Sequence, residues 1–224
     1  MRPLTFVAPL VVALASVTSA QQLSPATRLD NMAPITYFIA TGKPATGFRP
    51  GDPQLARWAL EAWQRSAAGA LRFAPAATEE AALVRLYWPA PVEGNFGETQ
   101  PLVVGNRRGA AVFIRTDMEA LGPEIERRAA GDPLFRDTIV YLTCVHEIGH
   151  ALGLSHTRDF RDIMYFFGYG GDVTEYFARY RRAITSRSDI ATASGLSPAD
   201  VGRLRALYSG AGVLPASRSW RGSR

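Results

Sequence analysis

The stretch HEIGHALGLSH, residues 146–156, contains all three histidines of this 224-residue chain. His146 and His150 are four residues apart, so on a helix they lie on the same face, one turn apart. Gly153 can adopt a positive φ and end that helix, which would allow the chain to bring His156 back to the same point. The pattern therefore predicts a helix whose C-terminal end directs three imidazoles at one position in space.

Three neutral imidazoles with a fourth position left open are the ligand set of a catalytic zinc site, whereas structural zinc sites have four protein ligands. Glu147 follows the first of these histidines, and its carboxylate could take a proton from a zinc-activated water. The spacing HExxHxxGxxH is a motif of zinc-dependent hydrolysis of amide bonds. We therefore expect Zn²⁺ to bind His146, His150 and His156, with Glu147 as the general base.

The composition is typical of a folded domain, with 47% hydrophobic and 20% charged residues. The formal net charge of +5 does not follow a stripe with interleaved aromatic residues, so we expect a solvated basic surface and no nucleic-acid partner. Cys144 is the only cysteine, which excludes an internal disulfide. It lies among apolar residues of the predicted helix, so we expect a buried thiol.

Residues 1–20 have the features of a secretory signal peptide: a positive start at Arg2, an apolar run over 4–17, and small residues before Gln21. The alternative is an uncleaved N-terminal anchor. The signal peptide predicts secretion, or export to the periplasm in a Gram-negative bacterium, with no stable membrane anchor. Residues 210–224 contain arginines and no acid, and we expect a basic, flexible tail there.

Hydrophobic periodicity predicts an α+β arrangement in which strands precede most of the helices. Strands are expected over 35–40, 71–75 and 81–88, and two more within 94–117, where Pro101 favours a sheet edge for the first. Helices are expected over 52–70, 137–153, 171–186 and 196–209, with Asp52, Asp137, Asp172 and Ser197 as their caps and Glu175 completing a capping box with Asp172.

The histidine motif followed by Met164 and Tyr165 resembles the metzincin metalloproteases, and the eight-residue step from His156 to Met164 resembles their matrixin branch, which includes the matrix metalloproteases. The likeness extends more weakly over residues 35–209, which would form the catalytic domain after a short N-terminal segment, 21–34. The resemblance implies zinc on the three histidines, Glu147 as general base, and Met164 as an apolar floor under the metal.

The resemblance also implies a fold and a second set of candidate residues. The fold would be a mixed, mostly parallel twisted sheet with an antiparallel edge strand, an active-site helix and a C-terminal helix. Residues 165–195 are longer than the corresponding matrixin loop, which shapes a substrate pocket. This insertion makes four aromatic residues candidates for that pocket: Tyr165, Phe166, Phe167 and Tyr169. The alternative is surface decoration without a role in binding.

Members of the family bind an extended peptide as an added strand, and residues 96–104 are the candidate edge for a protein or peptide substrate. The alternative is an ordinary edge strand. Calcium, common in the family, could involve Asp117 or Glu119, although no ligand spacing supports it. The second, histidine-rich zinc site of the family has no ligands here because no other histidine is present. We expect a monomer.

Two other interpretations keep part of the motif. In a thermolysin-like arrangement Glu175 would replace His156 as third ligand, which leaves Gly153, His156 and Met164 unexplained. In a secreted zinc-bearing binding protein the metal would be held without turnover. The sequence opposes this second interpretation only in that every residue needed for catalysis is present.

Overall fold

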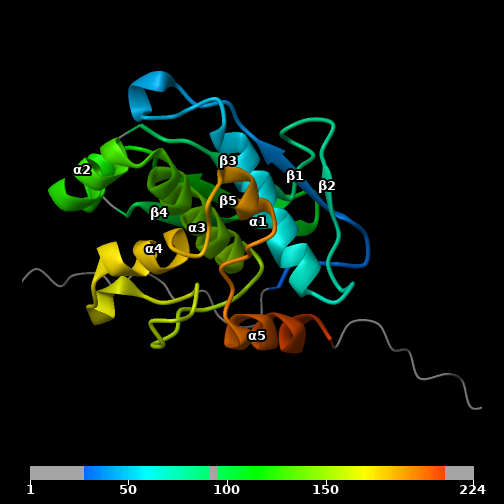
Figure 1. Cartoon of the computed structure of the whole chain (residues 1–224). Coiled ribbons are helices and arrows are strands. Elements are labelled where there is room, and N and C mark those ends of the chain that lie inside the picture. The colour runs from blue at the N-terminus through cyan, green and yellow to red at the C-terminus, as the bar shows by residue number, and fades with distance from the viewer. Residues whose placement is uncertain (1–27, 91–94, 210–224) are drawn as a thin grey trace, which may run out of the picture.

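The computed structural model describes residues 28–90 and 95–209 of the chain (Figure 1). The predicted signal peptide, residues 1–20, and the predicted tail, residues 210–224, lie outside the described residues, as do residues 21–27 of the N-terminal segment.

Five strands form one sheet in the order β2-β1-β3-β5-β4. They are β1 (Ile35–Ile39), β2 (Phe73–Pro75), β3 (Val84–Tyr87), β4 (Gly97–Val104) and β5 (Arg107–Ile114). β1 pairs in parallel with β2 and β3, and β3 with β5, whereas β4 runs antiparallel to β5 at the edge. This confirms the predicted mostly parallel sheet with an antiparallel edge strand, and it places Pro101 on that edge.

Helices α1 (Asp52–Ser66) and α3 (Pro133–Ala151) pack together on one face of the sheet (Figure 1). Trp63 of α1 is fully buried and donates its indole N–H to the carbonyl of Val145 at 2.9 Å. The other helices are α2 (Pro123–Gly131), α4 (Val173–Arg181) and α5 (Pro198–Tyr208), with 3-10 turns η1 (Pro44–Thr46), η2 (Met118–Leu121), η3 (Phe167–Tyr169) and η4 (Arg187–Ala191). Together they complete the α+β fold.

The predicted helix boundaries were wrong in three places. The active-site helix α3 begins at Pro133, and Asp132 is its cap, accepting from the backbone N–H groups of Leu134 and Phe135 at 3.1 Å. The helices predicted to end at residues 70 and 186 end at Ser66 and Arg181. Asp172 caps α4 as predicted, but Glu175 bonds Arg182 and does not complete the capping box.

Asp52 and Asp137 are not the caps that the sequence predicted, because both serve a buried ion cluster. Both carboxylate oxygens of Asp52 accept from the guanidinium of Arg136, which is 1% exposed. Asp137 lies within α3 and accepts from Arg187 at 2.7 Å. A buried carboxylate needs such partners, and they lie too far along the chain for a capping rule to detect.

Two further helices show where local signals succeed and fail. Ser197 caps α5 as predicted, in a reciprocal capping box with Asp200. Helix α2 was not predicted: its nine residues, PEIERRAAG, bury only Ile125 and Ala129, which are too few apolar positions to indicate a helix.

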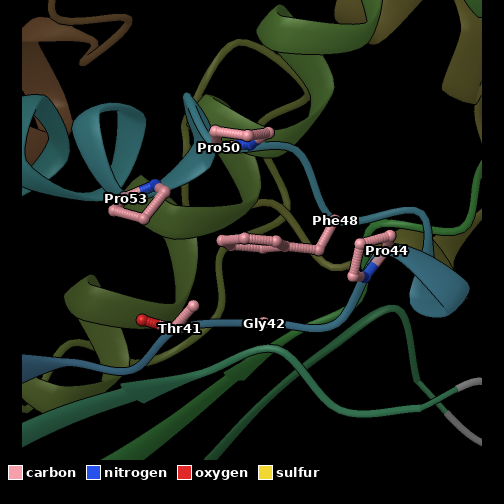
Figure 2. Close-up of a pocket in the computed structure, with 6 residues that line it drawn as sticks. All are labelled: Thr41, Gly42, Pro44, Phe48, Pro50 and Pro53. Carbon is pink, nitrogen blue, oxygen red and sulfur yellow. The ribbon is translucent and has the colours of Figure 1, made fainter.

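A hollow of about 390 Å³ lies between the end of β1 and the start of α1. Figure 2 shows the Phe48 ring at its centre, with Pro50 on one side and the backbone of Thr41 and Gly42 on the other. Pro44 and Pro53 complete the lining. None of these side chains is a usual metal ligand, so this hollow is not a candidate metal site.

Among the helices of the described residues, none combines the length and the apolar character needed to cross a bilayer.

We predict that Arg136→Met lowers the free energy of unfolding by about 3–5 kcal/mol, because it leaves the Asp52 carboxylate buried without its partner. Urea denaturation would measure the loss. Arg182→Met, which removes an exposed ion pair with Glu175, is the control and should cost far less. Equal losses in the two variants would contradict the stabilising role of the buried pair.

Candidate metal centre

The side chains of His146 and His150 project from the last turns of α3, and their Nε2 atoms lie 3.2 Å apart. The Nε2 atom of His156 lies 3.0 Å from that of His150. Among the described residues these three form the one group of His, Cys, Asp or Glu side chains arranged to hold a metal ion. The structure therefore brings together the three histidines that the sequence predicted.

In two of these histidines, a hydrogen bond from the other ring nitrogen, Nδ1, fixes the tautomer. His146 Nδ1 lies 2.6 Å from the carbonyl oxygen of Ile163, and His150 Nδ1 lies 2.9 Å from that of Leu154. A carbonyl oxygen can only accept, so each Nδ1 carries the proton and each Nε2 presents a lone pair. Two lone pairs then face each other at 3.2 Å with no proton between them, an arrangement that a shared cation relieves.

Two of the three distances between the histidine Nε2 atoms are close to those of a zinc site. Zinc–nitrogen bonds of about 2.0–2.1 Å in a tetrahedral site separate two ligand nitrogens by about 3.3–3.4 Å, close to the 3.2 and 3.0 Å found here. Burial lowers the pKa of His146 and of His150. Burial and the two neighbouring imidazoles lower the pKa of His156 to about 4. All three rings are therefore neutral at pH 7, as metal ligands must be.

The turn after α3 brings His156 back to the helix. Gly153 has a φ of +100°, a conformation that favours glycine, and it confirms the predicted helix end. The following loop is closed by the N–H of Thr157 donating to the carbonyl of Met164 at 2.8 Å and by that of Phe166 donating to the carbonyl of Thr157 at 3.3 Å. The closed loop fixes His156 next to the helical pair.

Met164 is fully buried directly against α3. A Cβ atom placed on Gly149 would lie 2.4 Å from the Met164 sulfur, so the glycine between the two helical histidines allows this close contact. The predicted role of Met164 as an apolar floor under the metal agrees with this position and stays a prediction.

The Glu147 carboxylate is 5% exposed and lies against strand β4. The Thr99 hydroxyl donates to Glu147 Oε2 at 2.8 Å. A Cβ atom on Gly97 would lie 2.5 Å from Glu147 Oε1, so only glycine leaves room there. Burial raises the pKa of Glu147, while His150 and the Thr99 hydroxyl oppose the rise. The edge strand therefore shapes the space around this carboxylate.

Comparison with known families agrees with this geometry. A model of the peptidase family described as Peptidase_M10: Matrixin matches residues 30–175, more than half of the chain. The chain belongs to the matrixin family. No curated protein shows a significant match to it. Matrixins are zinc-dependent metalloproteases, and the three histidines of this matrixin are positioned to bind such a metal.

The four aromatic candidates for the substrate pocket of this matrixin divide into two pairs. Tyr165 is buried and donates to the carbonyl of Gly170 at 2.9 Å, and Phe167 packs against the core. Phe166 and Tyr169 are 42% and 47% exposed. Phe166 stacks on His156, with ring centroids 4.7 Å apart. Phe166 and Tyr169 are therefore the more accessible pair, and Phe166 lies directly beside the metal site.

Sequence reasoning missed the residues that contact the predicted base Glu147 and the predicted ligands His146 and His150. Gly97 and Thr99 lie on the edge strand, and nothing in their local sequence connects them to Glu147. The carbonyls of Leu154 and Ile163 act through the backbone, which leaves no side-chain signal.

Asp117, a candidate calcium ligand, forms an ion pair with Arg115 at 2.5 Å.

We predict that His156→Ala abolishes stoichiometric retention of zinc, because only two imidazoles then remain to bind the metal. Glu175→Ala should retain zinc, since this carboxylate bonds Arg182 at 2.5 Å and is not part of the histidine group. Elemental analysis after dialysis would measure both variants. Zinc retention by His156→Ala, or its loss from Glu175→Ala, would contradict the ligand set.

Proposed function

We propose that this matrixin is an endopeptidase that hydrolyses peptide bonds of protein or peptide substrates, with Zn²⁺ on His146, His150 and His156 and Glu147 as general base. The proposal depends on one observation: the Nε2 atoms of three histidines converge at the end of helix α3, which also carries the buried Glu147 carboxylate. Three protein ligands leave the zinc with an open position, which is typical of catalytic sites.

The bound Zn²⁺ would supply Lewis acidity, which polarises the scissile carbonyl and acidifies water. Glu147 would accept the proton that water loses as its oxygen bonds to the carbonyl carbon. The same carboxyl group would then donate this proton to the amide nitrogen as the C–N bond breaks. The Thr99 hydroxyl, 2.8 Å from Oε2, would hold the carboxylate in one orientation through both transfers.

The position of β4 supports binding of the substrate as an extended strand. β4 pairs with β5 on one side only and forms the edge of the sheet, so a peptide could add to its other side. Gly97 and Thr99 of the same strand contact Glu147, which would place such a peptide beside the metal centre. Phe166 and Tyr169 are the candidate side chains for its recognition.

Location and assembly are proposed on the sequence alone. The features of residues 1–20 favour export of the protein, to the extracellular space or to a periplasm. We propose a monomer that acts without a nucleic-acid partner.

We expect the purified protein to cleave casein or gelatin, and we expect a zinc chelator to abolish this cleavage. Glu147→Gln should bind zinc as the wild type does but lose cleavage, because the amide cannot accept the proton. Gel electrophoresis and elemental analysis would measure the two properties. A wild type that binds zinc and cleaves no protein would instead indicate a zinc-bearing binding protein without turnover.

We also predict that Thr99→Val lowers kcat by about tenfold or more, since a hydrogen bond to a charged group contributes about 1.5–3 kcal/mol. KM should change little because the hydroxyl contacts Glu147 and not the predicted ligand-binding side of β4. Thr99→Ser, which keeps the hydroxyl, is the matched control and should restore most of kcat. Equal kcat values for the valine and serine variants would contradict an orienting role for this hydroxyl.

A further inference from the structure

Helix α4 (Val173–Arg181) lies within the predicted insertion, residues 165–195. Its side chains form hydrogen bonds with the backbone of the segment that precedes Met164. Two of its side chains lie within hydrogen-bond distance of four consecutive carbonyl oxygens, those of residues 160–163. Arg179 donates to Phe160 at 2.5 Å and to Arg161 at 3.2 Å. Tyr176 places its hydroxyl 3.0 Å from the carbonyl oxygen of Asp162 and 3.2 Å from that of Ile163. We call these two side chains the α4 clamp.

The α4 clamp is fixed by packing. Tyr176 is 3% exposed, and its ring meets those of Phe160 and Phe167 edge to face, with centroids 5.5 and 4.9 Å apart. The Arg179 guanidinium lies over the Tyr176 ring, 4.3 Å from its centroid, an arrangement that cation–π attraction stabilises. The hydroxyl and the guanidinium therefore have little freedom to leave the carbonyls.

One backbone atom, the carbonyl oxygen of Ile163, connects the α4 clamp to the metal centre. The carbonyl oxygen of Ile163 that lies beside the Tyr176 hydroxyl is also the acceptor for His146 Nδ1, at 2.6 Å. Asp200 of α5 accepts from the N–H of the same residue, Ile163, at 2.8 Å. Ile163, the residue whose carbonyl orients His146, is therefore hydrogen-bonded by side chains of both α4 and α5.

We propose that Tyr176 and Arg179 are positioning residues for the metal ligand His146, and that the 165–195 insertion braces the metal centre. A histidine ligand depends on the partner of its other nitrogen, and loss of such a partner typically weakens metal binding by about 10–100-fold. The clamp fixes the position of that partner. Both clamp residues lie beyond residue 175, where the match to the family model ends, so this brace is contributed by sequence outside the matched region.

This inference rests on metal binding by the three histidines and not on turnover, so its test uses zinc affinity. Tyr176→Phe removes the clamp hydroxyl and keeps the packed ring. Tyr180→Phe is a matched control on the same helix, because Tyr180 is also buried and its hydroxyl bonds the carbonyl of Ala193 instead of residues 160–163. Competition with a chromophoric chelator would measure the dissociation constant for zinc in each full-length protein.

We expect Tyr176→Phe to weaken zinc binding on the order of tenfold, the lower end of the range for partners of a metal ligand, and Tyr180→Phe to leave it unchanged. Arg179→Met should weaken binding in the same direction. The absorption spectrum of the Co²⁺-substituted protein should also change in Tyr176→Phe and not in Tyr180→Phe, because the orientation of His146 differs.

Wild-type zinc affinity in Tyr176→Phe, or an equal loss in Tyr180→Phe, would overturn the bracing role. A wild type that binds zinc but cleaves no protein would refute only the proposed peptidase activity, because the affinity comparison would still stand. A wild type that binds no zinc would refute both proposals.

Discussion

The constraint on which this structure depends is the convergence of imidazole lone pairs on one point. The carbonyls of Ile163 and Leu154 hold the Nδ1 protons of His146 and His150, so both Nε2 atoms face each other as acceptors. Without a cation this arrangement is repulsive, and the long helix, the turn at Gly153 and the closed loop after it all maintain it. Much of the fold can be understood as the support for that geometry.

The parts of the site that sequence could predict are those encoded within one or two helical turns. The spacing of the histidines, the helix end at Gly153 and the capping box at Ser197 follow from local geometry, and the structure agrees with each. The edge position of Pro101 follows from its missing N–H. These features need no knowledge of which distant segments meet.

The features that the sequence could not predict all depend on contacts between segments that are far apart in the chain. The local sequence predicts that Asp52 caps a helix, whereas in the fold Asp52 pairs with Arg136, which is 84 positions away in the chain. The local sequence indicates only that Thr99 is a strand residue. In the fold β4 packs against α3, and the Thr99 hydroxyl bonds Glu147. In both cases the carboxylate of a buried residue, Asp52 or Glu147, is involved, and burial makes a hydrogen-bonding partner obligatory. Its identity depends on the tertiary structure.

The 165–195 insertion shows the same division within a single segment. Its exposed half, with Phe166 and Tyr169, lies beside His156 and is free to contact a substrate. Tyr176, which is buried, and Arg179, which is partly buried, bond consecutive carbonyls of residues 160–163 on the other side of the segment. One insertion can therefore both support the metal centre and border the surface on which a substrate would bind.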